Sequence, residues 1–251
     1  MSVKLQALLD APIIELDTID STNNYAMRLI DADTAQDGLT LIARHQTQGK
    51  GQRGKSWQDD GVDSLLMSLI VCPAYTLDQQ FVFSAAIAVA IADTVQLLCE
   101  NSHICIKWPN DIIVNDKKAG GILIENVLRG SKWMYAIIGL GLNVKQASFP
   151  SDLPLATSLF YASGKEIDIE QLGYLVRRKL LEAISEPKPA EEVLKEYNDL
   201  LYRKGQRQLF TEGENESYVQ VCEVLPNGQL MVQHDNGSIA YYTHGIENWK
   251  W

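Results

Sequence analysis

The segment of residues 49–57, which reads GKGQRGKSW, limits the folds open to this chain more than any other stretch. It contains three glycines and three cations within a protein whose formal net charge is −10. Glycine lets backbone N–H groups come close to an anion, and lysine or arginine neutralises that anion. The segment therefore predicts a phosphate-binding loop, and a solvated basic hairpin is the alternative.

Residues 49–56 also match the pattern G-x-x-x-x-G-K-[ST] of P-loop nucleoside triphosphatases. A P-loop needs a strand before it and a helix after it, because the helix N-terminus binds the phosphates. Residues 39–44 are short, apolar and partly β-branched, as a strand should be. Residues 57–64 show no helical period and contain a glycine, and residues 65–71 resemble another strand. The pattern favours a phosphate loop of another type, with the P-loop as the minor alternative.

The order of apolar runs along the chain predicts a mixed α/β protein with a second, smaller β domain. Strands are expected at 12–19, 39–44, 65–71, 104–108, 111–114, 117–127 and 133–144. Helices are expected through 25–30, with Ser21 or Thr22 as N-cap, and at 81–100, 168–185 and 190–202. From Gly205 onward, short strands alternate with Asn-Gly turns. We therefore predict domains at residues 1–203 and 204–251.

Composition excludes several classes of protein. A net charge of −10 argues against nucleic acid as a partner, because duplex binding needs a basic face. The four cysteines and four histidines are scattered, without zinc-ligand spacing or a nucleophile–base arrangement. We expect reduced thiols, a cytoplasmic location and no covalent catalysis. No apolar run is expected to span a bilayer; residues 81–99 come closest, and polar side chains interrupt them.

Charged and small residues gather between two strand-like runs. Residues 107–111 read KWPND and residues 118–121 read KAGG. Lys107 and Asp111 could simply pair at a strand end. A lysine beside small residues, such as Lys118, is placed to act as a point charge on a carboxylate or phosphate. The alternative for Lys118 is a solvated hairpin lysine.

Residues 139–143 read GLGLN and end an apolar strand. Glycines at such a position mark either a β-bulge or the close approach of a ring to the backbone. Asn143 would supply a donor and an acceptor beside that ring. Trp57 is either a core residue or a surface on which an adenine stacks.

Several motifs occur together in this chain in a fixed order. They are Ser21-Thr22-Asn23, Gln46 with residues 49–57, residues 107–111, residues 118–123, residues 139–143, and residues 156–159, which read ATSL. Each motif alone is common, but their order and spacing resemble those of biotin protein ligases, from about residue 13 to the C-terminus.

The resemblance implies a class II synthetase-like catalytic domain of the α+β or α/β class, a mixed sheet with helices on one side, and a C-terminal SH3-like β-barrel. It also implies a two-step reaction. ATP converts the biotin carboxylate to biotinyl-AMP with release of pyrophosphate, and biotin then passes to a lysine of a biotin carboxyl carrier protein. The implied small molecules are ATP, Mg²⁺ and biotin, and an acetyl-CoA carboxylase subunit is the usual carrier. A homodimer is compatible with the family.

The resemblance also assigns roles to residues. Those assigned to catalysis are Lys118, Arg53 and Lys50. Those assigned to biotin are Ser21, Thr22, Asn23, Gln46, Gly49, Lys50, Gly51, Gln52, Lys118, Gly120 and Gly121. Those assigned to the nucleotide are Arg53, Trp57, Lys107, Asn110, Asp111 and Asn143. Magnesium is expected to bind through the phosphates, with Asp111 as the candidate protein ligand. These residue types suit the chemistry, because bringing a carboxylate to a triphosphate requires fixed cations and no nucleophile.

Two features depart from the family. The family loop usually reads G-R-G-R, whereas here Lys50 and Gln52 replace the arginines. Either Arg53 takes over part of that role, or the adenylate is held less firmly. The first matching strand begins near residue 12, so we expect no preceding helix-turn-helix domain, no repressor function and little DNA affinity. The rivals are a lipoate-type ligase, whose glycine-rich signature is absent here, a P-loop triphosphatase, and a non-catalytic biotin-binding module.

Overall fold

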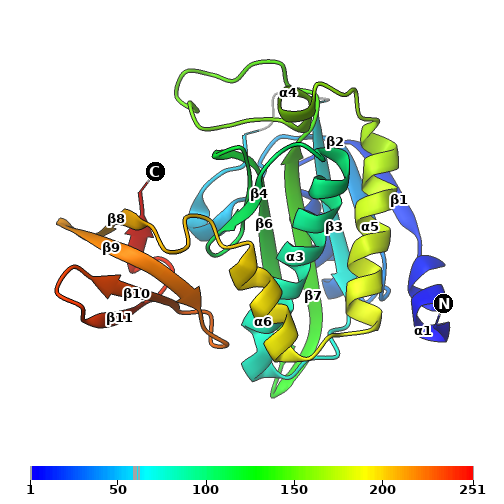
Figure 1. The fold of residues 1–251 in the computed structure, drawn as a ribbon. Coiled ribbons are helices and arrows are strands. Elements are labelled where there is room, and N and C mark those ends of the chain that lie inside the picture. Colours follow the sequence, from blue (N-terminus) through cyan, green and yellow to red (C-terminus); the bar gives the residue numbers. More distant parts are fainter. Residues whose placement is uncertain (1, 59–60, 62, 251) are drawn as a thin grey trace.

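Two β-sheets organise the protein (Figure 1), whose computed structural model describes residues 2–58, 61 and 63–250. The larger sheet has seven strands in the order β1-β2-β3-β7-β6-β5-β4, and the smaller has five in the order β11-β10-β9-β8-β12. Only the β1–β2 pair is parallel among the strand pairs described. The predicted fold class, a mixed sheet with helices followed by a small β structure, is confirmed.

The elements follow the predicted order. The strands of the larger sheet are β1 (Ile13–Ile19), β2 (Thr40–Gln46), β3 (Ser64–Val71), β4 (Ile104–Lys107), β5 (Asp111–Val114), β6 (Lys117–Arg129) and β7 (Lys132–Asn143). The helices are α1 (Val3–Leu9), α2 (Thr22–Asp31), α3 (Gln80–Leu98), α4 (Leu159–Ser163), α5 (Ile169–Ser185) and α6 (Ala190–Asp199), with single 3₁₀ turns η1 (Gln52–Gly54) and η2 (Leu77–Gln79). The smaller sheet contains β8 (Arg207–Glu212), β9 (Asn215–Val224), β10 (Leu230–His234), β11 (Ile239–Tyr242) and β12 (Glu247–Trp249). The short elements α1, α4 and β12 were not predicted.

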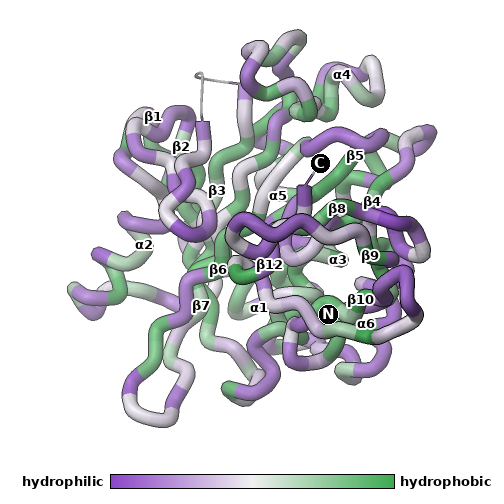
Figure 2. Tube along the Cα trace, turned by 90° about the vertical axis from the view of Figure 1, so that its left-hand side faces the viewer, coloured by the Kyte–Doolittle hydropathy of each residue, from purple (hydrophilic) through white to green (hydrophobic). Residues whose placement is uncertain are grey.

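Helices cover both faces of the larger sheet, which corrects the expectation of helices on one side. Along β3, Leu65, Met67 and Leu69 join the core beneath α3 and α5, whereas Ile70 joins a second core with α2. This division follows from the two-residue alternation of a strand. Figure 2 shows hydrophobic stretches of β3 and β7 running between α2 on one side and α3 on the other. The face that carries α2 is the face on which the candidate site lies.

The buried helix predicted at residues 81–100 is present as α3. By length and composition, the stretch Leu77–Leu98 is apolar enough to cross a bilayer, so the expectation that no run meets that criterion was wrong. In the structure this stretch packs against the sheet and against α5 and α6, and 56% of its most apolar window is buried. Its apolar residues all round the helix therefore serve the core of this fold.

The helical part ends with α6, and the smaller sheet begins at Arg207. The predicted boundary at residue 203 falls between them and stays a prediction; the outer ends of the two predicted domains, residues 1 and 251, lie outside the described residues. Asn198 links the two parts, because its amide group exchanges two hydrogen bonds with the backbone of Val224 (2.7 and 3.0 Å). The smaller sheet is thereby held against α6, beside the edge of the larger sheet (Figure 1).

Arg177 of α5 anchors the N-terminal helix. Its guanidinium is buried and donates to the carbonyl oxygens of Leu8 (2.9 Å) and Ala11 (2.9 Å) and to the hydroxyl of Thr40 (2.9 Å). Burial lowers the pKa of Arg177. These acceptors include carbonyls at the C-terminus of α1, which have no partner within the helix.

We expect Arg177→Leu to destabilise the protein by about 3 kcal/mol, because it removes a charged donor that binds several buried carbonyls and the hydroxyl of Thr40. The melting temperature should fall by roughly 6–12 °C for a chain of this size. Thermal unfolding followed by circular dichroism measures the change. Arg178→Leu is the matched control, because Arg178 is an exposed neighbour whose ion pair within the described residues is with Glu182. Equal losses in the two variants would contradict the anchoring role.

Candidate active site

One cavity of about 480 Å³ lies between the two sheets, a size suited to a small-molecule site. It brings together most of the predicted site residues from five separate segments. Those that line it are Ser21, Thr22, Asn23, Gln46, Lys50, Gly51, Gln52, Arg53, Trp57, Lys107, Asn110, Asp111, Lys118 and Gly121. Gly49, Gly120 and Asn143 do not line it.

Two glycines of β7 make room for the walls of the cavity. A Cβ at Gly139 would lie 2.4 Å from Oδ1 of Asn23, and one at Gly141 would lie 2.6 Å from the indole of Trp57. Both glycines pair with β3 and β6 in continuous register, so the β-bulge interpretation was wrong. The other interpretation was that a ring approaches the backbone at these glycines. A ring does so, and it is the indole of Trp57.

One end of the cavity is a wall of neutral polar groups at the start of α2. Oε1 of Gln46 accepts hydrogen bonds from the backbone N–H of Thr22 (2.7 Å) and from its hydroxyl (3.1 Å). Ser21 is the N-cap residue, as predicted, but its side chain makes no capping bond, and Gln46 satisfies the helix instead. Ser68 of β3, which the sequence did not single out, lies 2.7 Å from the hydroxyl of Thr22.

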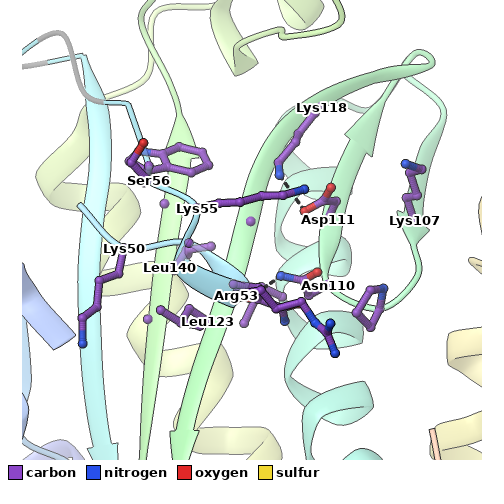
Figure 3. Close-up of a pocket in the computed structure, with 18 of the residues that line it drawn as sticks. Lys50, Arg53, Lys55, Ser56, Lys107, Asn110, Asp111, Lys118, Leu123 and Leu140 are labelled. Carbon is purple, nitrogen blue, oxygen red and sulfur yellow. Dashed lines mark hydrogen bonds and ion pairs between the residues drawn. The ribbon is translucent and has the colours of Figure 1, made fainter. Parts of the chain in front are cut away.

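The other end of the cavity is cationic. Nζ of Lys118 lies 2.7 Å from Oδ1 of Asp111, and Figure 3 shows Lys118 and Lys55 both directed at that carboxylate. Asp111 thus forms an ion pair with Lys118; Lys107, whose pairing with Asp111 was the alternative, lies opposite Asp111 across β4 and β5.

A register shift between β5 and β6 creates this arrangement. Lys118 pairs with Ile113, whereas Gly120 pairs with Ile112, so β6 carries one extra residue there. Without the shift, Lys118 and Gly121 would lie on opposite faces of the strand. With it, a Cβ at Gly121 would lie 3.6 Å from Nζ of Lys118, on the cavity floor. Gly120 points the other way and packs on Leu142, which is why it does not line the cavity.

The glycine-rich segment forms a closed loop over the cavity. Its ends are joined by hydrogen bonds from Trp57 N to Gly49 O (2.9 Å) and from Gly51 N to Lys55 O (2.7 Å). Gly49 is needed for the closure itself, because a Cβ there would lie 2.7 Å from the carbonyl of Trp57. No helix follows Ser56 among the described residues before β3, and residues 59, 60 and 62 lie outside them. The P-loop interpretation finds no support in this geometry.

The smaller sheet completes the cavity, which the sequence did not predict. The lining residues that it contributes are His244, Glu247, Asn248, Trp249 and Lys250. Arg53 donates to the carbonyl of His244, and its guanidinium occupies the space that a Cβ at Gly245 would fill. Arg53 is thus bound to the smaller sheet. Burial lowers the pKa of His244, and the nearby Arg53 lowers it further, so the imidazole is neutral at pH 7.

Among the described residues, six cations and two carboxylates line the cavity, against the net negative charge of the whole chain. The cations are Lys50, Arg53, Lys55, Lys107, Lys118 and Lys250, and the carboxylates are Asp111 and Glu247. The low-dielectric walls strengthen this local positive field. The cavity is therefore suited to anionic ligands.

Lys107 is the most buried of these cations, with 6% of its surface exposed. Its Nζ lies 3.4 Å from the carbonyl oxygen of Trp249 and 5.4 Å from the centre of that indole. Burial lowers the pKa of Lys107 to about 8, and the charge of Asp111 only partly opposes this effect. A buried cation that lines a cavity is a candidate contact for an anionic ligand.

We expect Lys107→Met to stabilise the free protein at pH 7. Since the folded-state pKa is about 8, below the ordinary value of 10.5, the cation destabilises the fold below pH 8. That cost, on the order of 3 kcal/mol, fades as the pH rises from 8 to 10.5. The variant should therefore have the higher melting temperature at pH 7, and the difference between the two melting temperatures should shrink as the pH rises from 8 to 10.5. Lys117→Met, which removes a cation outside the cavity, is the control; a less stable Lys107→Met protein at pH 7 would contradict the expectation.

A second pocket of about 370 Å³, here called the outer pocket, adjoins the cavity at Ser56, Trp57 and Lys118. Asn143 lines it, and its amide donates to the carbonyl of Thr157 (3.0 Å), which ties down the segment after β7. Ala156, from the motif at residues 156–159, also lines it, and the lining residues that the sequence did not single out include Gln146, Phe149, Pro150 and Leu153. The outer pocket is largely apolar, in contrast to the cavity.

Unsatisfied polar atoms cluster in these two sites. Within the described residues, the buried side-chain atoms without a hydrogen-bond partner are Oε1 of Gln52, Nε1 of Trp57 and Oε1 of Gln146. Gln52 lines the cavity, Gln146 lines the outer pocket, and Trp57 lines both. Buried polar atoms usually have partners, so these three indicate where a ligand supplies complementary groups.

Comparisons with known proteins agree with the fold and the motifs. The sequence model of the biotin/lipoate A/B protein ligase family matches residues 15–143. The bifunctional ligase/repressor BirA of Bacillus spizizenii is 36% identical over 62% of this chain and 48% of its own length. The biotin–[acetyl-CoA-carboxylase] ligase of Mycobacterium tuberculosis is 35% identical over 55% of this chain and 51% of its own length. The chain thus spans about half the length of these curated relatives.

A solved structure extends the likeness in fold over nearly the whole chain. The biotin protein ligase of Aquifex aeolicus, in complex with biotin and ATP, superposes with a TM-score of 0.78 at 23% identity. The match covers 95% of this chain and 98% of that one, so it includes the smaller sheet.

Proposed function

Because this chain belongs to the biotin/lipoate A/B protein ligase family, we propose that it is an ATP-dependent biotin–protein ligase. It would join biotin to AMP with release of pyrophosphate, and then transfer biotin to a lysine of a biotin carboxyl carrier domain. The matched relatives carry ligase names, and the matched Aquifex structure holds biotin and ATP.

The observation that carries the proposal is the contrast in polarity between the two ends of the cavity. Its neutral wall of Ser21, Thr22, Asn23 and Gln46 offers hydrogen-bonding groups without charge, as a ureido ring requires. The opposite end offers Lys118, Lys55 and the glycine-rich loop, as a carboxylate and a phosphate require. A molecule with a neutral ring at one end and a carboxylate at the other could place its ring against the neutral wall and its carboxylate at the cationic end.

In the first step, a biotin carboxylate oxygen attacks the α-phosphorus of ATP, and the bond to the pyrophosphate oxygen breaks. Two anions must approach each other, so fixed cations lower the barrier most. Lys118 is the residue that we assign to the reacting groups, because its amine meets the carboxylate of Asp111 at the cationic end. Lys50 and Arg53 would act through the loop, with Arg53 bound to His244.

In the second step, the amine of the carrier lysine attacks the biotinyl carbonyl carbon. The C–O bond to the phosphate breaks, AMP leaves with the electron pair, and the attacking nitrogen loses a proton to solvent as the amide forms. The loop over the cavity would exclude water from the mixed anhydride until the carrier arrives. This step needs no protein nucleophile.

The donor set fits magnesium held mainly by the phosphates. Among the described residues, no group of three or more histidine, cysteine, aspartate or glutamate side chains gathers as a metal site. Asp111 is the candidate protein ligand at the cationic end, beside Asn110. The ion would neutralise phosphate charge when bound.

We place the adenine in the outer pocket. The pocket is largely apolar, it adjoins the cationic end of the cavity at Lys118, and Trp57 and Gln146 present unsatisfied polar atoms to it. Asn143 would then act beside the base, as the resemblance implies, while Lys107 would lie nearer the phosphates.

The test is to incubate the protein with radiolabelled ATP, biotin and a carrier domain. We expect labelled biotinyl-AMP, release of pyrophosphate, and biotinylated carrier. ATP turnover without biotin would favour the P-loop alternative, and turnover with lipoate alone would favour a lipoate-type ligase. Biotin binding without pyrophosphate release would favour a non-catalytic module.

The remaining expectations are part of the same proposal. The carrier would be a domain of the acetyl-CoA carboxylase type, encountered in the cytoplasm, and a homodimer is compatible with the family. The acidic net charge supports low affinity for DNA at physiological salt, which a gel shift measures.

A further inference from the structure

Glu125 lies on β6, outside every motif that the sequence suggested. Residues 121, 123 and 125 share one face of this strand, because they pair with residues 141, 139 and 137 of β7. Gly121 and Leu123 line the cavity, so Glu125 is the next residue along the same face. Its side chain is 28% exposed and carries two interactions, one with each oxygen.

The first oxygen holds the neutral wall. Oε2 of Glu125 accepts from Nδ2 of Asn23 at 2.7 Å, and Ser68 lies 2.6 Å from Oδ1 on the other side of the amide. Asn23 is 3% exposed and lies against Gly139. A carboxylate only accepts hydrogen bonds, so it forces the NH₂ group of Asn23 towards β6. The carbonyl oxygen of the amide then faces Ser68.

The second oxygen holds the glycine-rich loop. Oε1 of Glu125 lies 3.2 Å from Nζ of Lys50, whose side chain is 41% exposed. In Figure 3, Lys50 extends away from the cluster around Asp111. Lys50 precedes Gly51, a residue of the cavity lining. The ion pair thus fastens the start of the loop to the strand that carries Lys118.

We propose that Glu125 is a positioning residue that couples the neutral wall of the cavity to the glycine-rich loop. One oxygen sets the orientation of the Asn23 amide, which would face biotin. The other oxygen pairs with Lys50 and so keeps the glycine-rich loop next to the neutral wall. The proposal rests on the proposed function for the identity of the ligand. The contact between loop and strand does not depend on it.

Two variants separate the two oxygens. In Glu125→Gln, the amide oxygen still accepts from Asn23, but the NH₂ group that replaces the other oxygen repels Lys50. We expect the Kd for biotin to stay within about threefold, while amide hydrogen exchange in residues 49–57 becomes faster. Glu125→Ala loses both contacts, so the Kd should rise on the order of tenfold or more, as for a lost bond to a charged group.

A double-mutant cycle tests the coupling to Lys50. Lys50→Met should raise exchange in the loop as much as Glu125→Gln does, and the double variant should add nothing further. Glu182→Gln is the matched control, because Glu182 also binds two cations and is 32% exposed, on α5 away from the cavity. It should change neither biotin affinity nor loop exchange.

The outcomes distinguish this inference from the proposed function. If the unsubstituted protein binds no biotin in calorimetry, the proposed function fails, and loop exchange in the cycle still tests the ion pair. If it binds biotin and Glu125→Ala binds it equally well with unchanged loop exchange, the positioning role is overturned. Additive effects of Lys50→Met and Glu125→Gln would also overturn it.

Discussion

Lys118→Ala should reduce the rate of biotinyl-AMP formation on the order of a thousandfold, the largest loss expected from a single side chain here. The substitution has two effects. It removes a cation from the reacting groups, and it exposes the charge of Asp111, which Lys118 neutralises at 2.7 Å. An unpaired carboxylate would then repel both the biotin carboxylate and the α-phosphate. Single-turnover release of pyrophosphate measures the loss.

The fold should survive this change, because Lys118 is one third exposed and its backbone pairing is unaffected. Lys117→Ala, one residue earlier and outside the cavity, is the control and should keep full activity. Adding Asp111→Asn to Lys118→Ala should recover part of the rate if the exposed carboxylate contributes. Pyrophosphate release at the unsubstituted rate in Lys118→Ala would exclude the role assigned to this lysine.

Gly139→Ala should abolish biotin binding, because the added methyl group would lie 2.4 Å from Oδ1 of Asn23. Asn23 has little freedom to retreat, since Glu125 and Ser68 hold its amide from two sides. The clash must push Asn23 into the cavity or distort β7. We expect the Kd to rise at least a hundredfold, the equivalent of about 2.7 kcal/mol. Isothermal titration with biotin alone measures it.

A second substitution shows whether the clash is the cause. In Gly139→Ala with Asn23→Ala the space is restored, so the melting temperature should return towards that of Asn23→Ala alone. Biotin affinity should stay low, because the amide is missing. Gly121→Ala is the control for folding only, because an added methyl group there would meet its nearest protein atoms at an ordinary 3.6 Å; its melting temperature should match that of the unsubstituted protein. Tight biotin binding by Gly139→Ala would show that Asn23 is not part of the wall.

The positions of most strands, of the longer helices and of the loop along the chain could be predicted from the sequence, whereas the order of the strands in the sheet was not predicted. Strand β3 has the apolar run of a buried strand, α3 is apolar on all sides, and residues 115–116, an Asn-Asp pair with positive φ, form the turn between β5 and β6. These signals are local, because they depend on neighbours within a few residues. The short α1, α4 and β12 carry too few residues for such a period to emerge.

Neighbouring residues in the site show what local sequence signals cannot predict. Gly120 and Gly121 are equivalent in sequence, yet only Gly121 lines the cavity, because the two residues face opposite sides of β6. Asn143 was grouped with the nucleotide site from its place in the motifs, but the sequence did not show that it lines the outer pocket, whereas Asn110 and Asp111 line the cavity. Glu125 and Ser68 belong to no motif, and their importance depends on partners on other elements.

The sequence by itself determined which groups this protein brings to its chemistry: a glycine-rich cationic loop, a Ser-Thr-Asn helix start and a lysine beside small residues. Only the tertiary structure decided which of them meet. The register shift in β6 turns Lys118 towards Asp111, the glycines of β7 admit Asn23 and Trp57, and the smaller sheet supplies Trp249 and the partner of Arg53. Residue types and short periods are local properties. The face of a strand and the neighbour across a cavity depend on pairings between segments far apart in the chain.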